Sequence, residues 1–232
     1  MDANVATGMS SRARCFFSST IGLKQVMGFT GLVWCGFLFS HMAGNLLLFK
    51  SAEAYNKYSY ALTSNPLLIL AEAFLVLTLL LHVINGFCVS AKNRSAKGVK
   101  PATALSGSKN SSFAVKTMIF QGVLILFYLI NHLIHFKFGT HYTVVYGGVE
   151  MRDIYKLVVE EFQSPLYTLF YVLMMVVLGF HLSHGFYSSF QTLGFNHPRY
   201  SPWLKRGGCA FALIVSMGFL IQPVFVHFFA QP

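Results

Sequence analysis

The sequence predicts an all-α integral membrane protein with five transmembrane helices in a bundle. Of its 232 residues, 55% are hydrophobic and only 10% are charged, whereas soluble domains carry about 25% charged residues. Five apolar runs of at least 20 residues are almost free of charge. Runs of this length cross the hydrocarbon core as helices, because lipid offers an open backbone no hydrogen-bond partner. The composition therefore excludes an ordinary soluble enzyme and a disordered tail.

The five runs define one membrane domain over residues 25–229. They cover residues 25–49, 66–91, 117–136, 165–190 and 207–229. The second and fourth runs open with Asn65-Pro66 and Ser164-Pro165, and a capping residue followed by proline is typical of the start of a helix. The remaining length is enough for connecting loops but not for a separate soluble domain.

The distribution of lysine and arginine predicts which side of the membrane each loop occupies. The chain has 17 basic and 7 acidic residues, a net charge of +10. Twelve basic residues lie in the N-terminal segment, residues 1–24, or in the loops after the second and fourth runs, and five lie on the other side. The positive-inside rule therefore places the N-terminus in the cytoplasm. Because these charges flank apolar runs, we expect membrane lipid, and no nucleic acid, around the chain.

Two loops have a composition that predicts their structure. Residues 150–163, between the third and fourth runs, place Ile154, Leu157 and Val158 at helical spacing, which predicts a short amphipathic helix on the outer surface. Residues 92–116, between the second and third runs, are rich in serine, glycine and lysine. This second composition is typical of a mobile connection.

Histidines inside the runs are the main functional signal, because ionisable groups within a membrane are costly and usually functional. Four of them lie 16 or 17 residues after the first proline or the flanking lysine of their run: His41, His82, His132 and His181. That spacing corresponds to about 24 Å of helix. Since alternate runs enter from opposite sides, His41 and His132 share a level near the outer face. His82 and His181 share a level near the inner face, about 15–20 Å away.

Two histidines that face each other at one level are what a haem with paired axial imidazoles requires. Such iron has no open position for O₂, so the expected role is electron transfer through two haems. Gly86 and Gly185 follow His82 and His181 by one turn, in a repeated H-x-x-x-G-F pattern. A missing side chain there leaves room for a flat porphyrin against the helix, so we expect both glycines to pack against the inner haem.

Three further residues are candidates for the site. His135 and His184 lie three residues after His132 and His181, on roughly the same helix faces, so periodicity alone does not choose within each pair. Depth favours His132, and the glycine pattern favours His181. Glu72 is the only acid within a run, about 9 Å below the outer face. Its carboxyl could exchange protons with a quinone, or it could reach the headgroups or pair with a neighbouring side chain.

The segments around the four histidines resemble the di-haem cytochrome b subunit of succinate:quinone oxidoreductases. This family includes succinate dehydrogenases and quinol:fumarate reductases with a single five-helix membrane anchor. The resemblance covers residues 24–229 and rests on FSHMAGN at residues 39–45, LHVING at 81–86, INHLIHF at 130–136 and FHLSHG at 180–185.

The resemblance implies a membrane-anchor and electron-transfer subunit of the bacterial cytoplasmic (inner) membrane. It would carry electrons through two b haems, between an iron–sulfur partner subunit and a membrane quinone (menaquinone or ubiquinone). His82 and His181 would hold the haem nearer the soluble subunits, and His41 and His132 the distal haem. A partner flavoprotein with FAD would interconvert succinate and fumarate, since this chain has no dinucleotide fingerprint or cysteine cluster. Some fumarate reductases of the family carry a glutamate, proposed to pass protons, where this sequence has Gly179.

Other membrane proteins are alternatives. Cytochrome b anchors of hydrogenases and formate dehydrogenases also hold two haems. Five helices, four of which carry one histidine ligand each, favour the succinate:quinone oxidoreductase family instead. A membrane di-metal hydroxylase would use the two H-x-x-H pairs, His132 with His135 and His181 with His184, yet the topology places these pairs near opposite faces. A metal transporter should have more acidic residues in its spans.

Overall fold

The computed structural model describes residues 19–96 and 113–230, and these residues are almost entirely helical. The elements are α2 (Thr20–Asn45), η1 (Leu46–Phe49), α3 (Ala52–Thr63), α4 (Leu68–Ala96), α5 (Phe113–His132), η2 (Leu133–Lys137), β1 (Thr143–Tyr146), β2 (Val149–Arg152), α6 (Ile154–Phe162), α7 (Pro165–Thr192) and α8 (Ser201–Phe229). Most of the N-terminal segment, and the central part of the loop expected to be mobile, lie outside these residues.

Five helices of the described chain are long and apolar enough to cross a membrane, in agreement with the expected all-α fold class. Each contains most of one predicted run. The largest difference in their bounds is at α8, which begins at Ser201 rather than at residue 207. Pro202 lies in its first turn, where proline is well tolerated because the first amides of a helix have no partner within the helix.

The two predicted helix starts have different outcomes. α7 begins as expected, with Pro165 in the first turn and the Ser164 side chain accepting a hydrogen bond from the Tyr167 amide. α4 instead begins at Leu68. The Asn65 side chain accepts from the Leu67 amide at 2.9 Å, so Asn65-Pro66 opens a turn that precedes the helix.

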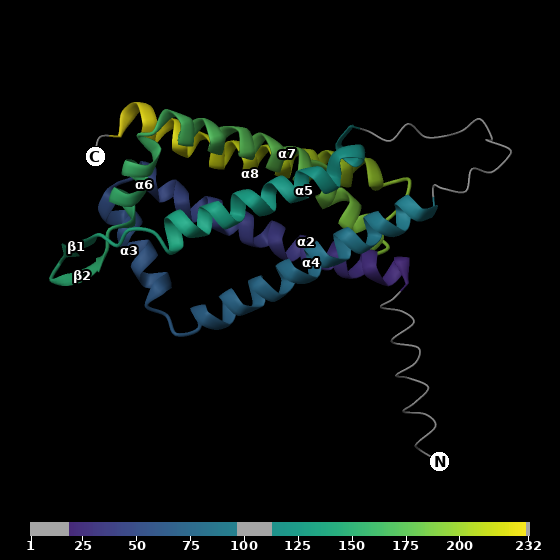
Figure 1. The fold of residues 1–232 in the computed structure, drawn as a ribbon, viewed down its shortest axis with the longest axis horizontal. Helices are drawn as coiled ribbons and strands as arrows, with labels where there is room; N and C mark the ends of the chain where they lie inside the picture. Colours follow the sequence, from purple (N-terminus) through teal and green to yellow (C-terminus); the bar gives the residue numbers. More distant parts are fainter. Residues whose placement is uncertain (1–18, 97–112, 231–232) are drawn as a thin grey trace, which may run out of the picture.

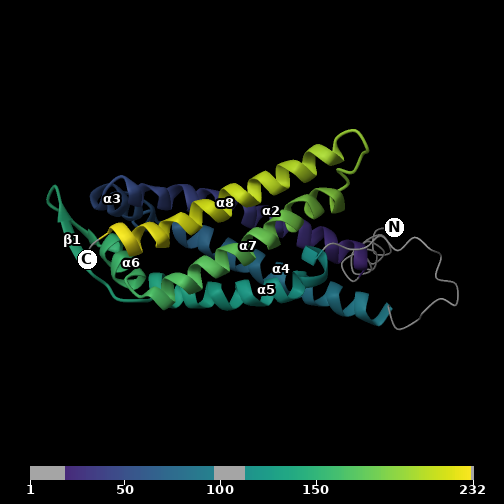
Figure 2. The same ribbon diagram turned by 90° about the horizontal axis from the view of Figure 1, so that it is seen from above.

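The transmembrane helices run along the long axis of the molecule (Figure 1). α2 packs against α4, α7 and α8, and Figure 2 shows α7 between α8 and α5. The largest helix contact, between α7 and α8, encloses a buried apolar cluster that includes Met175, Leu178 and Val215. The outward faces carry many exposed leucine, isoleucine and phenylalanine side chains, as a lipid-facing surface does.

A small cap covers one end of the bundle. It consists of α3, the β1–β2 hairpin and α6, which lie together at the left of Figure 1, and we call this end the capped end. The helix expected over residues 150–163 is present as Ile154–Phe162. The expectation is wrong at its start, because residues 149–152 form β2 instead. Gly147 and Gly148 have positive φ and close a two-residue hairpin turn, a conformation that favours glycine.

Buried hydrogen bonds tie the cap together. Asn56 of α3 is fully buried; its amide donates to Asp153 Oδ1 at 2.8 Å, and its carbonyl oxygen accepts from the Tyr155 amide at 3.0 Å. The Gln163 side chain, directly after α6, donates to the Ala230 carbonyl at 3.0 Å. The cap therefore joins α3 to α6, and α6 to the end of α8.

Candidate functional site

The structure brings the four expected histidines together in two pairs. The His41 ring of α2 and the His132 ring of α5 have centroids 6.0 Å apart; we call them the capped-end pair. The His82 ring of α4 and the His181 ring of α7 have centroids 6.4 Å apart; we call them the mid-bundle pair. Each pair joins two helices that are not adjacent in the sequence.

Two glycines place the pairs at separate levels along the bundle. A Cβ atom built at Gly31 of α2 would lie 3.2 Å from Cε1 of His82, and one at Gly122 of α5 would lie 3.8 Å from Cε1 of His181. Both glycines therefore lie at the level of the mid-bundle pair. The capped-end histidine of the same helix follows each of them by ten residues, which is about 15 Å of helix.

The spacing within each pair fits a shared metal ion. An imidazole nitrogen binds a metal at about 2.0 Å and lies about 1.1 Å from its own ring centroid. Two rings on opposite sides of one ion therefore have centroids about 6 Å apart, close to the observed 6.0 and 6.4 Å. Packed aromatic rings show similar spacings. The hydrogen bonds of the ring nitrogens are therefore needed to distinguish a metal site from ordinary ring packing.

In the mid-bundle pair, one ring is oriented and the other has a free nitrogen. His82 Nδ1 lies 3.1 Å from the Met27 carbonyl oxygen. Because a carbonyl only accepts, Nδ1 carries the proton and Nε2 keeps its lone pair. His181 Nδ1 is buried and has no hydrogen-bond partner among the described residues. Buried polar atoms rarely lack partners, so this nitrogen suits a group that the protein binds.

The capped-end pair has polar partners from three helices. His132 Nδ1 lies 3.3 Å from the Tyr171 hydroxyl of α7, and His41 Nδ1 lies 3.3 Å from the Asn45 amide nitrogen. Asn45 Oδ1 in turn accepts from the Tyr55 hydroxyl of α3 at 2.6 Å. Burial raises the pKa of Tyr55, so this hydroxyl remains a donor at physiological pH. The Asn45 amide nitrogen also lies 3.5 Å from His41 Nε2 and donates to the His41 carbonyl at 2.8 Å, so these contacts hold the side chains around the capped-end pair in place.

The two alternative histidines have different surroundings. His135 Nδ1 lies within hydrogen-bond distance of Glu161 Oε2, at 3.1 Å, and its ring packs on Tyr167. His184 has no ring contact with another histidine in the described chain. Neither arrangement resembles the two pairs, which favours His132 and His181 as the ligands. No group of three or more histidine, cysteine or acidic side chains that could hold a metal ion occurs in residues 19–96 and 113–230.

Glu72 and the two expected glycines lie on helices of the bundle. Glu72 of α4 forms an ion pair with Lys137 of η2, and the two side chains are 35% and 41% exposed. This pairing is one of the roles expected for Glu72, and proton exchange with a quinone stays a prediction. A Cβ at Gly185 would meet nothing within 4 Å, and one at Gly86 would meet only Met27 Sδ, at 3.9 Å. Both therefore leave open space on α7 and α4, one turn from the mid-bundle pair.

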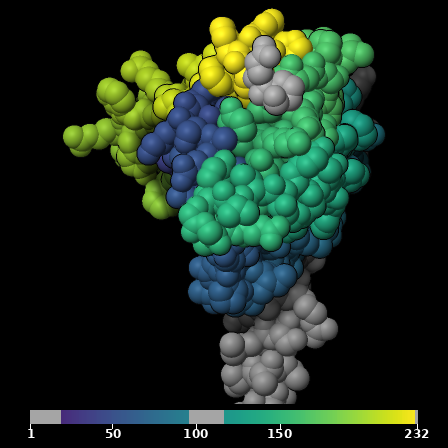
Figure 3. Space-filling view, turned by 90° about the vertical axis from the view of Figure 1, so that its left-hand side faces the viewer, coloured from purple at the N-terminus to yellow at the C-terminus, as the bar shows by residue number. Residues whose placement is uncertain are grey.

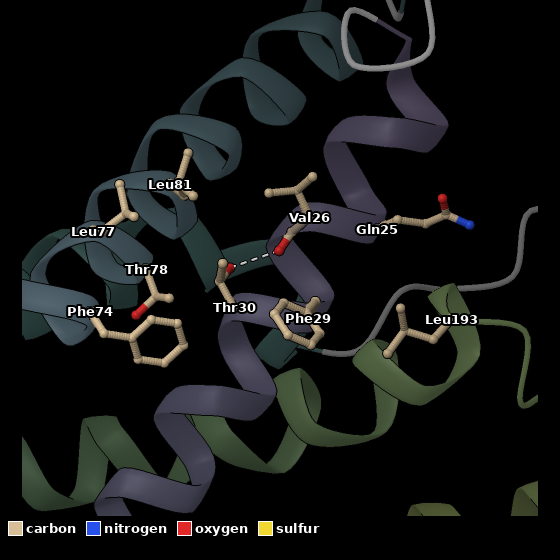
Figure 4. A pocket seen from close by; sticks show the side chains of 9 residues that line it. All are labelled: Gln25, Val26, Phe29, Thr30, Phe74, Leu77, Thr78, Leu81 and Leu193. Carbon is tan, nitrogen blue, oxygen red and sulfur yellow. Dashed lines mark hydrogen bonds between the residues drawn. The ribbon is translucent and has the colours of Figure 1, made fainter. Parts of the chain in front are cut away.

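An open, mainly apolar groove of about 490 Å³ lies between α2 and α4 (Figure 4). Its lining residues are Gln25, Val26, Phe29, Thr30, Phe74, Leu77, Thr78, Leu81 and Leu193. The Thr30 hydroxyl donates to the Val26 carbonyl at 2.8 Å and lies 3.4 Å from His82 Nδ1. The volume lies within the range of small-molecule sites, about 300–1,000 Å³.

Sequence reasoning missed several features of this site. Gly122, the Met27 carbonyl, the Tyr55 hydroxyl and the Tyr171 hydroxyl were not expected at the pairs. Only Gly122 has a signal in the sequence, since it precedes His132 by the same ten residues that separate Gly31 from His41. The other contacts depend on packing between distant segments.

Comparisons of the whole chain with protein-family models, with curated proteins and with solved structures found no match.

Proposed function

We propose that this chain is the membrane-anchor and electron-transfer subunit of a succinate:quinone oxidoreductase. In this proposal His41 and His132 hold one b-type haem, and His82 and His181 hold a second. The observation that carries it is the presence of two histidine pairs, each with ring centroids 6.0 or 6.4 Å apart, from four transmembrane helices. The sequence segments around these histidines add the resemblance to the family.

The contacts of the mid-bundle pair support a haem held by two histidines. Such a group, when bound, would supply a one-electron redox centre held by two imidazoles of the protein. Met27 holds the proton of His82 on Nδ1, which leaves Nε2 for the metal. The open space at Gly185 leaves room beside the His181 ring. The unpartnered Nδ1 of His181 is available as a ligand atom.

A quinone is the proposed electron partner within the membrane, either menaquinone or ubiquinone. The open apolar groove between α2 and α4 is the first candidate position for the quinone, because its lining residue Thr30 lies 3.4 Å from His82 Nδ1. Glu72 is a second candidate position near the capped end, where a carboxyl could exchange protons with the quinone. Binding of a labelled quinone to variants of Thr30 and of Glu72 separates the two positions.

The soluble partners are proposed from the resemblance and the charge distribution. A flavoprotein with FAD and an iron–sulfur subunit would dock at the end of the bundle opposite the cap, where the described basic residues Lys92, Arg94, Arg199, Lys205 and Arg206 lie. The capped end would then face away from the cytoplasm of a bacterial inner membrane. In this arrangement the dicarboxylate chemistry occurs in the flavoprotein, and this chain contributes quinone chemistry only.

Purification of the native complex tests the proposal. We expect a narrow low-spin b-type band in the reduced-minus-oxidised spectrum, about two haems per chain, and succinate–quinone activity in the complex. A colourless protein with bound zinc or non-haem iron would contradict it and favour a metal hydroxylase. Two haems with a hydrogenase or formate dehydrogenase as copurified partner would keep the haem sites and overturn the assignment to succinate.

Replacing Gly31 with alanine should weaken the mid-bundle site. The new Cβ would lie 3.2 Å from His82 Cε1, so the ring must shift away from its hydrogen bond to Met27. We expect the haem-to-protein ratio after purification to fall, by at most half, because only one site is affected. Gly122→Ala is the matched control, since its Cβ would make an ordinary contact with His181 at 3.8 Å. Equal ratios in both variants would contradict this assignment of the two glycines.

A further inference from the structure

A second, smaller cavity lies in the cap, away from the histidine pairs. Its volume is about 240 Å³, and it is lined by Ser59, Tyr60, Thr63, His141 and Arg152. α3 supplies the three hydroxyl side chains, and the loop before β1 and the end of β2 supply the imidazole and the guanidinium. Figure 3 views the molecule from this end, with α3 beside the hairpin. Each lining side chain carries a polar group, and none of them is acidic.

Arg152 is a fixed, partly buried cation without an acidic partner. Its Nη1 donates to the Lys137 carbonyl at 3.3 Å and its Nη2 to the Thr140 carbonyl at 3.2 Å. Its Nε is buried and has no partner among the described residues, and Arg152 takes part in none of the ion pairs found there. Burial lowers the pKa of Arg152, but a guanidinium keeps its proton in proteins. A partly buried charge of this kind is stabilised by an anion.

The other lining side chains are suited to an oxyanion. The hydroxyls of Ser59 and Tyr60 and the His141 ring form no hydrogen bond within the described part of the chain, and each of these groups can donate. The Thr63 hydroxyl already donates to the Ser59 carbonyl at 3.0 Å. A guanidinium together with hydroxyl and imidazole donors is the chemistry that binds phosphate oxygens.

The position of the cavity indicates which kind of phosphate-containing molecule it would bind. Thr63 lies directly before the turn into α4, and Lys137 ends the span that includes α5. The apolar side chains Leu62, Leu67 and Phe138 nearby are 46%, 65% and 73% exposed. A polar cavity between helix ends and exposed apolar side chains lies at the level of lipid headgroups.

We propose that this cavity binds the phosphate group of a membrane phospholipid, with Arg152 as its main charged contact. The hydroxyls of Ser59 and Tyr60 donate to the phosphate oxygens, and the acyl chains lie along the exposed apolar side chains of the neighbouring helix ends. The lipid would thereby join α3 of the cap to the hairpin. This site is independent of the haem proposal, because none of its residues contacts a histidine pair.

Native mass spectrometry of the full chain in detergent, with added phosphatidylglycerol, tests the site. We expect one phosphatidylglycerol to remain bound to the wild-type chain at moderate activation, and Arg152→Gln to weaken its binding at least about tenfold. Lys57→Gln is the matched control, because it removes one basic charge from an exposed position of α3. Equal binding by Arg152→Gln and the wild type would overturn the proposal.

Two further arms complete the experiment. Tyr60→Phe removes a single hydroxyl from a position that is 40% exposed, so the variant should fold, and we expect about threefold to tenfold weaker binding. Circular dichroism verifies the helix content of each variant. Inorganic phosphate alone should not displace the lipid at equal concentration; if it does, the cavity is a site for a free oxyanion and the lipid assignment is wrong.

Discussion

Under the proposed function, replacing His181 with alanine should remove one of the two haems per chain and leave the other in place. His181 belongs to the mid-bundle pair, and the capped-end pair lies about 15 Å away along the helices. Loss of one of the two imidazoles would weaken the binding of the proposed haem at this pair, while His41 and His132 keep their own contacts. The haem-to-protein ratio should fall from about two to about one, as measured by the pyridine haemochrome assay.

His184→Ala is the control for this experiment. It removes a histidine from the same helix, one turn further on, that is not paired with another histidine ring in the described residues. The variant should retain both haems. If His181→Ala also retained both, or if the ratio fell equally in the two variants, the assignment of the mid-bundle pair would be wrong. Loss of both haems from a folded His181→Ala chain would show that the two levels are not independent.

Replacing Asn56 with alanine should destabilise the cap more than any exposed substitution on α3. Asn56 is fully buried and makes hydrogen bonds to Asp153 and to the Tyr155 amide. Alanine leaves both groups without these bonds, at a cost of about 2–4 kcal/mol in the free energy of unfolding. For a chain of this size we expect the thermal midpoint to fall by about 5–15 °C, measured by tryptophan fluorescence in detergent.

Lys57→Ala serves as the neighbouring control. Lys57 pairs with Glu53 one turn away, and both side chains are 53% exposed. Exposed pairs of this type contribute about 0.5 kcal/mol or less, so the thermal midpoint should change by no more than about 2 °C. A similar midpoint for Asn56→Ala and Lys57→Ala would mean that the buried bonds of Asn56 do not hold the cap.

The transmembrane helices could be predicted from the sequence because lipid acts on each of them separately. A backbone in hydrocarbon must form its own hydrogen bonds, so an apolar run of sufficient length is a helix whatever its neighbours are. The cap is different, because its elements are stable only against each other. The buried side of α3, with Tyr55 and Asn56, is buried only because η1, α6 and the hairpin pack against it. The hairpin did have a local signal, Gly147-Gly148 between two short strands.

The histidine pairs could be expected from depth alone, since a helix converts residue number directly into position along the membrane normal. The contacts that orient the rings could not. The carbonyl of Met27 lies 55 residues from His82 in the sequence, and the Tyr171 hydroxyl lies 39 residues from His132. Such contacts depend on the rotation of each helix about its axis. Apolar side chains surround these helices on all sides, so the sequence pattern does not fix that rotation.

The alternation of partners has a consequence for biosynthesis. The first and third membrane segments share one pair, and the second and fourth share the other. A nascent chain that has inserted only two segments therefore contains half of each pair and neither of them complete. The third segment completes the capped-end pair, and the fourth completes the mid-bundle pair, so the two pairs become available in that order as translation proceeds.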